Sequence, residues 1–272
     1  GILNHILPRW GVATVFVDGP DLPQWRSALS EPTTAVFFES PSNPMQEIVD
    51  IAAVSELAHA AGATVVVDNV FATPLLQRCG ELGADVVVYS GTKHIDGQGR
   101  VLGGAILGTK EFIDGPVSAF NAWVLTKGLE TMALRVNHSS ASAVRLAEWL
   151  EEQPAVGWVK YPLLPSHPQY ELAARQMKAG GTVLTFELAA SAGRSAKEAA
   201  FALLDALRII DISNNLGDSK SLITHPATTT HRAMGPEGRA AIGLSDGVVR
   251  LSVGLEDLED LTRDLGQALK QV

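Results

Sequence analysis

A lysine closes an apolar run in VVVYSGTK, residues 86 to 93, directly after two hydroxyl residues, Ser90 and Thr92, that flank a glycine. A partly desolvated lysine has a lowered pKa and can act as a nucleophilic amine, as cofactors that carry an aldehyde require. The two hydroxyls could hold a phosphate. The alternative is that Lys93 is a surface lysine, because loops at strand ends are normally polar. This segment alone leaves both interpretations open.

Asp68 ends a second apolar run, ATVVVD. A buried carboxylate without a partner is costly, so we expect Asp68 to face a cation or several donors. Capping of a helix that begins near Thr73 is the alternative. Asp68 and Lys93 lie 25 residues apart, the length of one helix and one strand, which predicts adjacent or near-adjacent strand tips. A carboxylate there could keep a pyridine nitrogen protonated.

Asn43 and Arg250 are two further candidates. Asn43 lies in ESPSNP, where two prolines limit the backbone. It could bind a ring oxygen at a ligand-binding edge, or simply form part of a turn. Arg250 interrupts the strand-like segment VVRLSVG and needs an anion. That anion is either a structural carboxylate or a substrate carboxylate held by the guanidinium fork.

The elements that must position these residues follow a repeated pattern. Between residues 33 and 107, apolar runs alternate with polar clusters and helical stretches, which is typical of parallel strands joined by crossover helices. We expect strands at 13–18, 34–38, 64–68, 85–89 and 103–108, and helices at 47–61 and 73–82. The polar clusters follow the carboxyl ends of the strands, which is the edge where such sheets bind ligands.

The second half of the chain differs in character. A long helical pattern covers residues 121–152, and strand-like and helical segments follow it at 181–188, 195–207, 248–254 and 257–272. We therefore expect an α/β protein with a mostly parallel sheet in a large domain over residues 1–139. A smaller α+β domain would cover residues 140–272.

Composition excludes several classes of protein. The 272 residues carry a net charge of −9 and no basic stripe, which argues against a nucleic-acid partner. No apolar stretch approaches the ~20 residues that span a bilayer. The single Cys79 suits a reducing cytosol, so we expect a cytoplasmic protein. The histidines lack metal-ligand spacing, and no GxGxxG lies between a strand and a helix. The GxSxG match GLSDG, at 243–247, precedes an expected strand instead of following one, so it does not support a hydrolase nucleophile.

Six motifs occur in order along the chain: ESPSNP, VVVDNVFATP, YSGTK, SAFNAWVLTKGLETMALR, LGDSKSLITHPATTTH and VVRLSVGLEDLEDL. Together they resemble the pyridoxal-phosphate (PLP) enzymes of cysteine and methionine metabolism, the cystathionine γ-synthase family. The resemblance covers nearly the whole chain. Within the family, TKHIDGQGRVLGG is most similar to members that act on O-succinylhomoserine with sulfide.

The resemblance implies that Lys93 binds the PLP aldehyde covalently and, once substrate displaces it, moves protons as acid and base. Asp68 would pair with the pyridine nitrogen. Relatives often carry DNTF where this chain has DNVF, so Val70 removes one hydroxyl, and no contact of that hydroxyl is carried over to this chain.

The resemblance assigns the remaining candidates to other parts of the same site. Ser90 and Thr92 would contact the phosphate, and Asn43 the ring hydroxyl. Arg250 would bind the substrate carboxylate. Asn215, in NNLGD, matches a position near that carboxylate where relatives often carry Ser.

The resemblance also implies the type I fold of PLP-dependent transferases and a homotetramer with active sites shared between subunits. The implied reaction is γ-replacement, which forms homocysteine from O-succinylhomoserine and sulfide. Alternatives within the family are transfer to cysteine, as in cystathionine γ-synthase, and elimination by a γ-lyase. A PLP-binding regulatory protein without turnover is an alternative of another class.

Two stretches of the family pattern have no counterpart in the sequence. The chain begins at Gly1, without an initiator Met and within a helical pattern. We therefore expect missing upstream sequence, which in the family supplies a ring-stacking aromatic residue and further phosphate ligands. Relatives also carry additional residues around Val117 and Ser118, where we expect a mobile loop.

Overall fold

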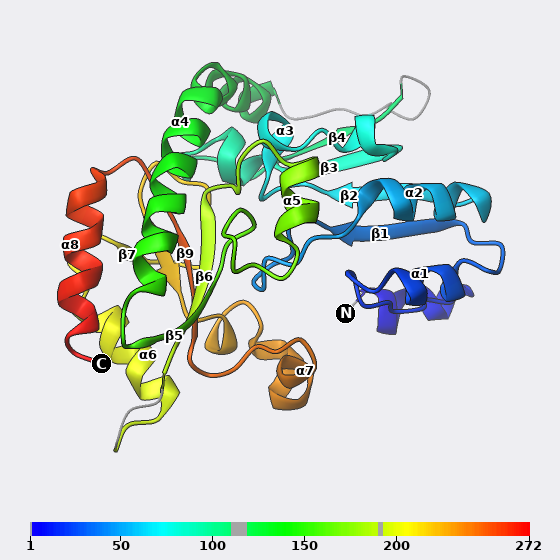
Figure 1. Cartoon of the computed structure of the whole chain (residues 1–272). Coiled ribbons are helices and arrows are strands. Elements are labelled where there is room, and N and C mark those ends of the chain that lie inside the picture. Colours follow the sequence, from blue (N-terminus) through cyan, green and yellow to red (C-terminus); the bar gives the residue numbers. More distant parts are fainter. Residues whose placement is uncertain (1, 110–118, 190–192) are drawn as a thin grey trace.

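The computed structural model describes residues 2–109, 119–189 and 193–272. It contains two sheets, with strand orders β1-β2-β3-β4 and β5-β6-β9-β8-β7. The long helix α4 (Ala119–Glu151) contacts elements of both halves of the molecule (Figure 1). The junction at Val117 and Ser118 lies outside the described residues.

The first sheet is mostly parallel, and it contains four of the predicted strands. Its strands are β1 (Ala35–Glu39), β2 (Thr64–Asp68), β3 (Val86–Ser90) and β4 (Gly104–Leu107). The first three run parallel, and β4 pairs antiparallel with β3. The valine-rich runs of β2 and β3 fit a buried pleated surface, because β-branched side chains pack well there. These four strand predictions are confirmed to within one residue at each end.

Helices and short turns surround the first sheet. The helices are α1 (Leu22–Ala28), α2 (Ile51–Ala60) and α3 (Thr73–Leu76), and the turns are η1 (Ile2–Ile6), η2 (Leu7–Trp10), η3 (Cys79–Leu82) and η4 (Gly91–Ile95). The sequence placed the start of α2 four residues too early. Asp50 caps this helix by accepting the N–H of Ala53 at 3.0 Å, which fixes its first turn.

Two local predictions are wrong. Residues 13–18 form no strand, because in the described part of the chain they have no strand neighbour to pair with. The helix expected over 73–82 ends after one turn. The buried Asn69 amide donates to the carbonyl oxygen of Gln77 at 2.9 Å, and Gln77 adopts an extended backbone instead of continuing the helix.

The second sheet is antiparallel except for one edge pair. Its strands are β5 (Val156–Lys160), β6 (Val183–Leu188), β7 (Asp211–Ile212), β8 (Leu222–Thr224) and β9 (Val248–Ser252), and only β7 and β8 run parallel. The remaining helices and turns are α5 (Tyr170–Gln176), α6 (Ala196–Ala206), α7 (Gly235–Ala241), α8 (Leu258–Leu269), η5 (Pro226–Thr228) and η6 (Arg232–Met234).

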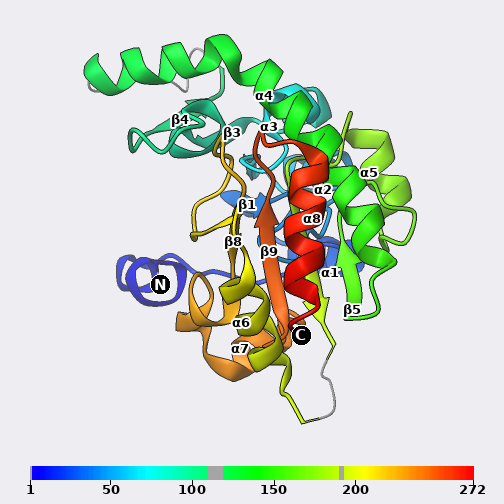
Figure 2. The same cartoon turned by 90° about the vertical axis from the view of Figure 1, so that its left-hand side faces the viewer.

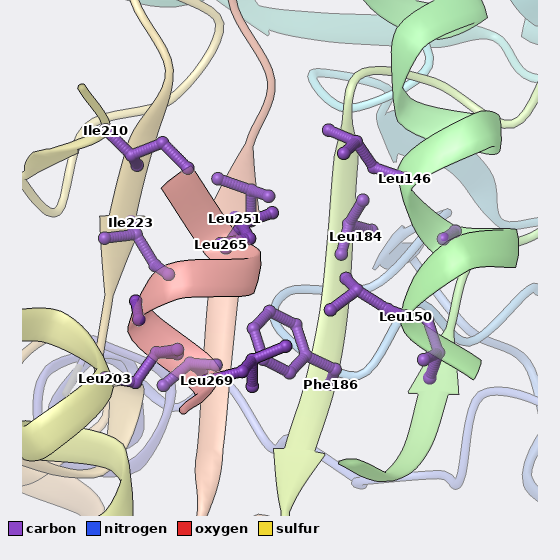
Figure 3. Close-up of a cluster of buried hydrophobic side chains, with 14 of the residues drawn as sticks. Leu146, Leu150, Leu184, Phe186, Leu203, Ile210, Ile223, Leu251, Leu265 and Leu269 are labelled. Atoms are coloured by element: carbon purple, nitrogen blue, oxygen red, sulfur yellow. The ribbon is translucent and has the colours of Figure 1, made fainter. Parts of the chain in front are cut away.

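The largest hydrophobic core lies between the second sheet and the helices α4, α6 and α8. Figure 3 shows Leu146 and Leu150 of α4 directed toward Leu184 and Phe186 of β6. Strand β9 lies at the centre of the sheet and continues toward α8 (Figure 2). All five residues of β9 are buried, so its backbone is firmly held.

The packing along α4 supports a division into two domains. Val136 packs in a cluster that contains Ile48 and Leu76 of the first half and also Ala173 and Met177 of the second half. Ala143, two turns later, belongs to the core of the second sheet. We therefore propose that the boundary between the domains 1–139 and 140–272 falls inside this helix.

Candidate active site

Two carboxylates lie at neighbouring strand tips. Glu39 at the end of β1 pairs in register with Asp68 at the end of β2. Asp68 Oδ1 accepts the N–H of Val70 at 3.0 Å. Burial raises the pKa of Asp68, and this hydrogen bond counteracts part of the rise. Among the described residues Asp68 has no ion-pair partner, so its carboxylate could accept a cationic ligand nitrogen.

Lys93 lies in η4, the turn that directly follows β3, and its backbone is not helical, with φ −92° and ψ −127°. Strands β2 and β3 are neighbours, as the spacing of Asp68 and Lys93 predicted. Lys93 Nζ donates to Asn215 Oδ1 at 2.5 Å. Burial, and to a smaller extent the Arg250 guanidinium, lower the pKa of Lys93. A lowered pKa leaves more of the amine unprotonated, as a nucleophile or proton acceptor needs.

Arg250 is buried in the middle of β9, with 2% of its surface exposed. Its Nη1 donates to Asn43 Oδ1 at 3.0 Å, and its Nη2 donates to the backbone oxygens of Asn214 and Asn215 at 3.0 and 3.2 Å. Its Nε has no hydrogen-bond partner among the described residues. Burial lowers the pKa of Arg250 to about 10. Because its bonded partners are neutral oxygens, the guanidinium can still receive an anion.

These contacts join four of the predicted residues in what we term the lysine–arginine cluster: Asn43, Lys93, Asn215 and Arg250. Asn215 is its centre, because its side chain accepts from Lys93 and its backbone oxygen accepts from Arg250. The structural carboxylate that was the alternative partner for Arg250 is not bonded to it among the described residues.

Ser90 and Thr92 lie next to this cluster in sequence but are not hydrogen-bonded to it. Ser90 ends β3 opposite Gly104 of β4. The Thr92 hydroxyl accepts the N–H of Gly103 at 3.2 Å. Both side chains are half-buried at the end of the strand that leads to Lys93. Their contact with a phosphate stays a prediction.

Glu39 is a candidate that sequence reasoning missed. Its Oε1 accepts the N–H of Asn43 at 2.8 Å, which links the strand tip to the lysine–arginine cluster. The pKa of Glu39 is raised to about 7. Burial is the largest cause of the rise and the charge of Asp68 adds to it, whereas the hydrogen bond from Asn43 and the charge of Arg250 counteract part of it. The signal in the sequence is its position, since Glu39 follows the apolar run TAVFF.

The described residues support neither a metal site nor a membrane-spanning helix. No group of three or more His, Cys, Asp or Glu side chains there could hold a metal ion. Over the same residues, no helix is both long and apolar enough to cross a membrane.

Comparisons with known proteins agree with this geometry. The family model for the Cys/Met metabolism PLP-dependent enzymes matches residues 1–270. The O-succinylhomoserine sulfhydrylase of Mycobacterium tuberculosis is 71% identical over 279 residues, which cover 98% of this chain and 68% of that protein. The O-succinylhomoserine sulfhydrylase of Pseudomonas aeruginosa is 48% identical over 278 residues, with the same shares covered.

A solved structure shows the same likeness in three dimensions. The cystathionine gamma synthase of Xanthomonas oryzae pv. oryzae matches with a TM-score of 0.92 at 37% identity, over 99% of this chain and 71% of that one. The fold and the site thus define a PLP-dependent enzyme of fold type I. The chain belongs to the Cys/Met metabolism family of these enzymes, so the predicted fold class, family and cofactor are confirmed.

The residues present fit PLP. Asp68 is a partly desolvated carboxylate without a cationic partner in the described chain, as a pyridine nitrogen needs. Lys93 presents an amine of lowered pKa, as an aldehyde needs. The buried Nε of Arg250 is an unused donor beside them. These three groups could respectively hold the ring nitrogen, the aldehyde carbon and the carboxylate of an amino-acid substrate.

Proposed function

We propose that the protein is an O-succinylhomoserine sulfhydrylase, a transferase that exchanges the succinate of O-succinylhomoserine for sulfide and so forms homocysteine. One observation supports this assignment most directly: Lys93 Nζ and Arg250 Nη2 both contact Asn215. A proton-transferring amine and a carboxylate-binding guanidinium therefore meet where one amino acid could bridge them. The 71% identity to the Mycobacterium tuberculosis enzyme supports the choice of substrate within the family.

Arg250 would bind the α-carboxylate of the substrate. Each hydrogen bond from a guanidinium to a carboxylate contributes about 1.5–3 kcal/mol, more than a bond to a neutral oxygen. Arg250 is buried and held by Asn43 and by the backbone of Asn214. The fork is thus oriented before the substrate arrives, so little side-chain entropy is lost on binding.

Lys93 would move the protons of the reaction. When bound, PLP supplies an aldehyde carbon that holds the substrate amino group and a ring that withdraws electrons from Cα. Asp68 would keep the ring nitrogen protonated. Lys93 Nζ would take the proton from Cα and then move protons at Cβ, for which its lowered pKa prepares it. Succinate leaves Cγ and sulfide adds there, so one C–O bond is exchanged for one C–S bond.

A second candidate is transfer to cysteine, which the likeness to a cystathionine gamma synthase favours. The test is to give the full-length protein O-succinylhomoserine or O-acetylhomoserine with sulfide or cysteine and to identify the products. We expect homocysteine from O-succinylhomoserine and sulfide. Cystathionine would indicate a synthase, and ammonia with a keto acid would indicate a γ-lyase. A bound cofactor whose absorbance never changes with substrate would indicate a regulatory protein.

We further propose a cytoplasmic homotetramer whose subunits share active sites. Exposed apolar side chains on β4 and at the start of α4 support this proposal, because such residues are often covered by another subunit or by another part of a longer chain. Among them are Ile106, Phe120 and Trp123, which are 58%, 65% and 59% exposed. Cys79 is a buried free thiol, as suits a reducing compartment. Sedimentation of the full-length protein should give a tetramer, and a monomer at micromolar concentration would contradict this proposal.

A further inference from the structure

One face of α4 is pressed against the segment that carries Lys93. A Cβ on Gly128 would overlap the carbonyl oxygen of Ile95, so only glycine fits there. Two turns further along the helix, the buried Arg135 donates from Nη1 to His94 O at 2.8 Å and from Nη2 to Ile95 O at 3.2 Å. One guanidinium therefore holds the two carbonyls that directly follow Lys93.

The segment needs such a partner because its backbone is irregular. The non-helical Lys93 interrupts η4, and buried carbonyls without a partner are costly. The guanidinium is itself held in place, since Nε donates to Thr131 Oγ1 at 3.1 Å and Nη2 donates to Gly128 O at 2.8 Å. A planar fork fixed at both ends defines the position of the carbonyls that it binds.

The same face of α4 also contacts the end of the strand that carries Arg250. Ser139 lies four residues after Arg135 and so projects from the same side of the helix. Its hydroxyl donates to Gly254 O at 2.7 Å, two residues beyond the end of β9. The helix is thus bonded to the segments of both Lys93 and Arg250, which come from different halves of the chain.

We propose that Arg135 is a positioning residue for Lys93, and that this face of α4 sets the distance between Lys93 and Arg250. Arg135 would act through His94 and Ile95, to whose carbonyl oxygens it donates. The expected effect of Arg135 on turnover rests on the proposed function, whereas its expected effect on cofactor attachment does not.

The test measures how fast PLP attaches to Lys93. Full-length wild type and the variants R135Q and R135K are mixed with PLP and trapped with borohydride at timed intervals, and the Lys93 peptide is quantified by mass spectrometry from pH 6 to pH 10. We expect R135Q to attach PLP about tenfold more slowly or worse, because small misplacements of a reacting group are costly. R135K should lie between, because an ammonium does not reproduce the fork.

The pH profile separates positioning from a general loss of structure. A released Lys93 becomes more solvated, so its pKa, and with it the midpoint of attachment, should rise by about one pH unit in R135Q. The matched control is R145Q, which removes an exposed arginine from the same helix and should behave as wild type. Wild-type rate and midpoint in R135Q would overturn the proposal.

A second variant and the choice of assay keep the test decisive. If circular dichroism shows that R135Q does not fold, R135K decides, and attachment at the wild-type rate in R135K overturns the proposal. Attachment is measured without O-succinylhomoserine. A protein that attaches PLP normally but never forms homocysteine would therefore contradict the proposed function while leaving the role of Arg135 standing.

Discussion

Replacing Glu39 by Gln tests the electrostatics of the strand tips. The pKa of Glu39 is raised from 4.5 to about 7 in the folded protein, mainly by burial. Between these values the native state holds a proton that the unfolded chain has lost, so this residue makes stability fall as pH rises through the window. At about 1.4 kcal/mol per pKa unit, the contribution is about 3 kcal/mol when the window has been crossed.

The assay is urea unfolding of wild type and E39Q from pH 5 to pH 8, at one saturating PLP concentration. The unfolding free energy of E39Q minus that of wild type should rise by about 2–3 kcal/mol from pH 5 to pH 8, because the amide of the variant has no proton to lose. A matched control is E56Q, which alters an exposed position on α2 and should run parallel to wild type. Parallel curves for E39Q and wild type would refute the reasoning.

Three further substitutions test the other groups of the site. R250K keeps the charge but loses the fork, so the KM for O-succinylhomoserine should rise about 10–100-fold in steady-state kinetics, and an unchanged KM would contradict the assignment. N215A removes the acceptor of Lys93 Nζ and disfavours the ammonium, so the acid limb of the kcat–pH profile should move to lower pH, and a move to higher pH would count against it. D68N loses the charged partner of the ring nitrogen, so the Kd for PLP should rise about tenfold or more in equilibrium dialysis, where wild-type affinity would speak against the pairing.

Much of the first sheet could be predicted because its strands have a recognisable local sequence pattern. Valine-rich runs that end at polar residues, such as those before Asp68 and Ser90, identify buried parallel strands. Parallel strands end at one edge, so the closeness of the two strand tips followed from spacing alone. Segment 13–18 has a similar local pattern but no paired neighbour in the described chain, and a strand requires one.

The remaining features of the site depend on contacts between distant residues. The pKa of Glu39 depends on burial and on the nearby Asp68 and Arg250, which no local pattern reveals. The hydrogen bond from Arg135 to His94 joins residues 41 positions apart. In the sequence, Arg135 cannot be distinguished from any other arginine on an amphipathic helix. Asn69 likewise ends α3 through a side-chain bond that competes with the helix.

The most direct test of the site is to find where the cofactor is attached. The full-length protein with bound PLP is reduced with borohydride and digested, and its peptides are mapped by mass spectrometry. The structure predicts a single phosphopyridoxyl group, on Lys93, the lysine whose pKa is lowered beside Asn215 and Arg250. K93A should carry none and form no homocysteine. The group on any other lysine, or homocysteine formation at the wild-type rate by K93A, would contradict the account.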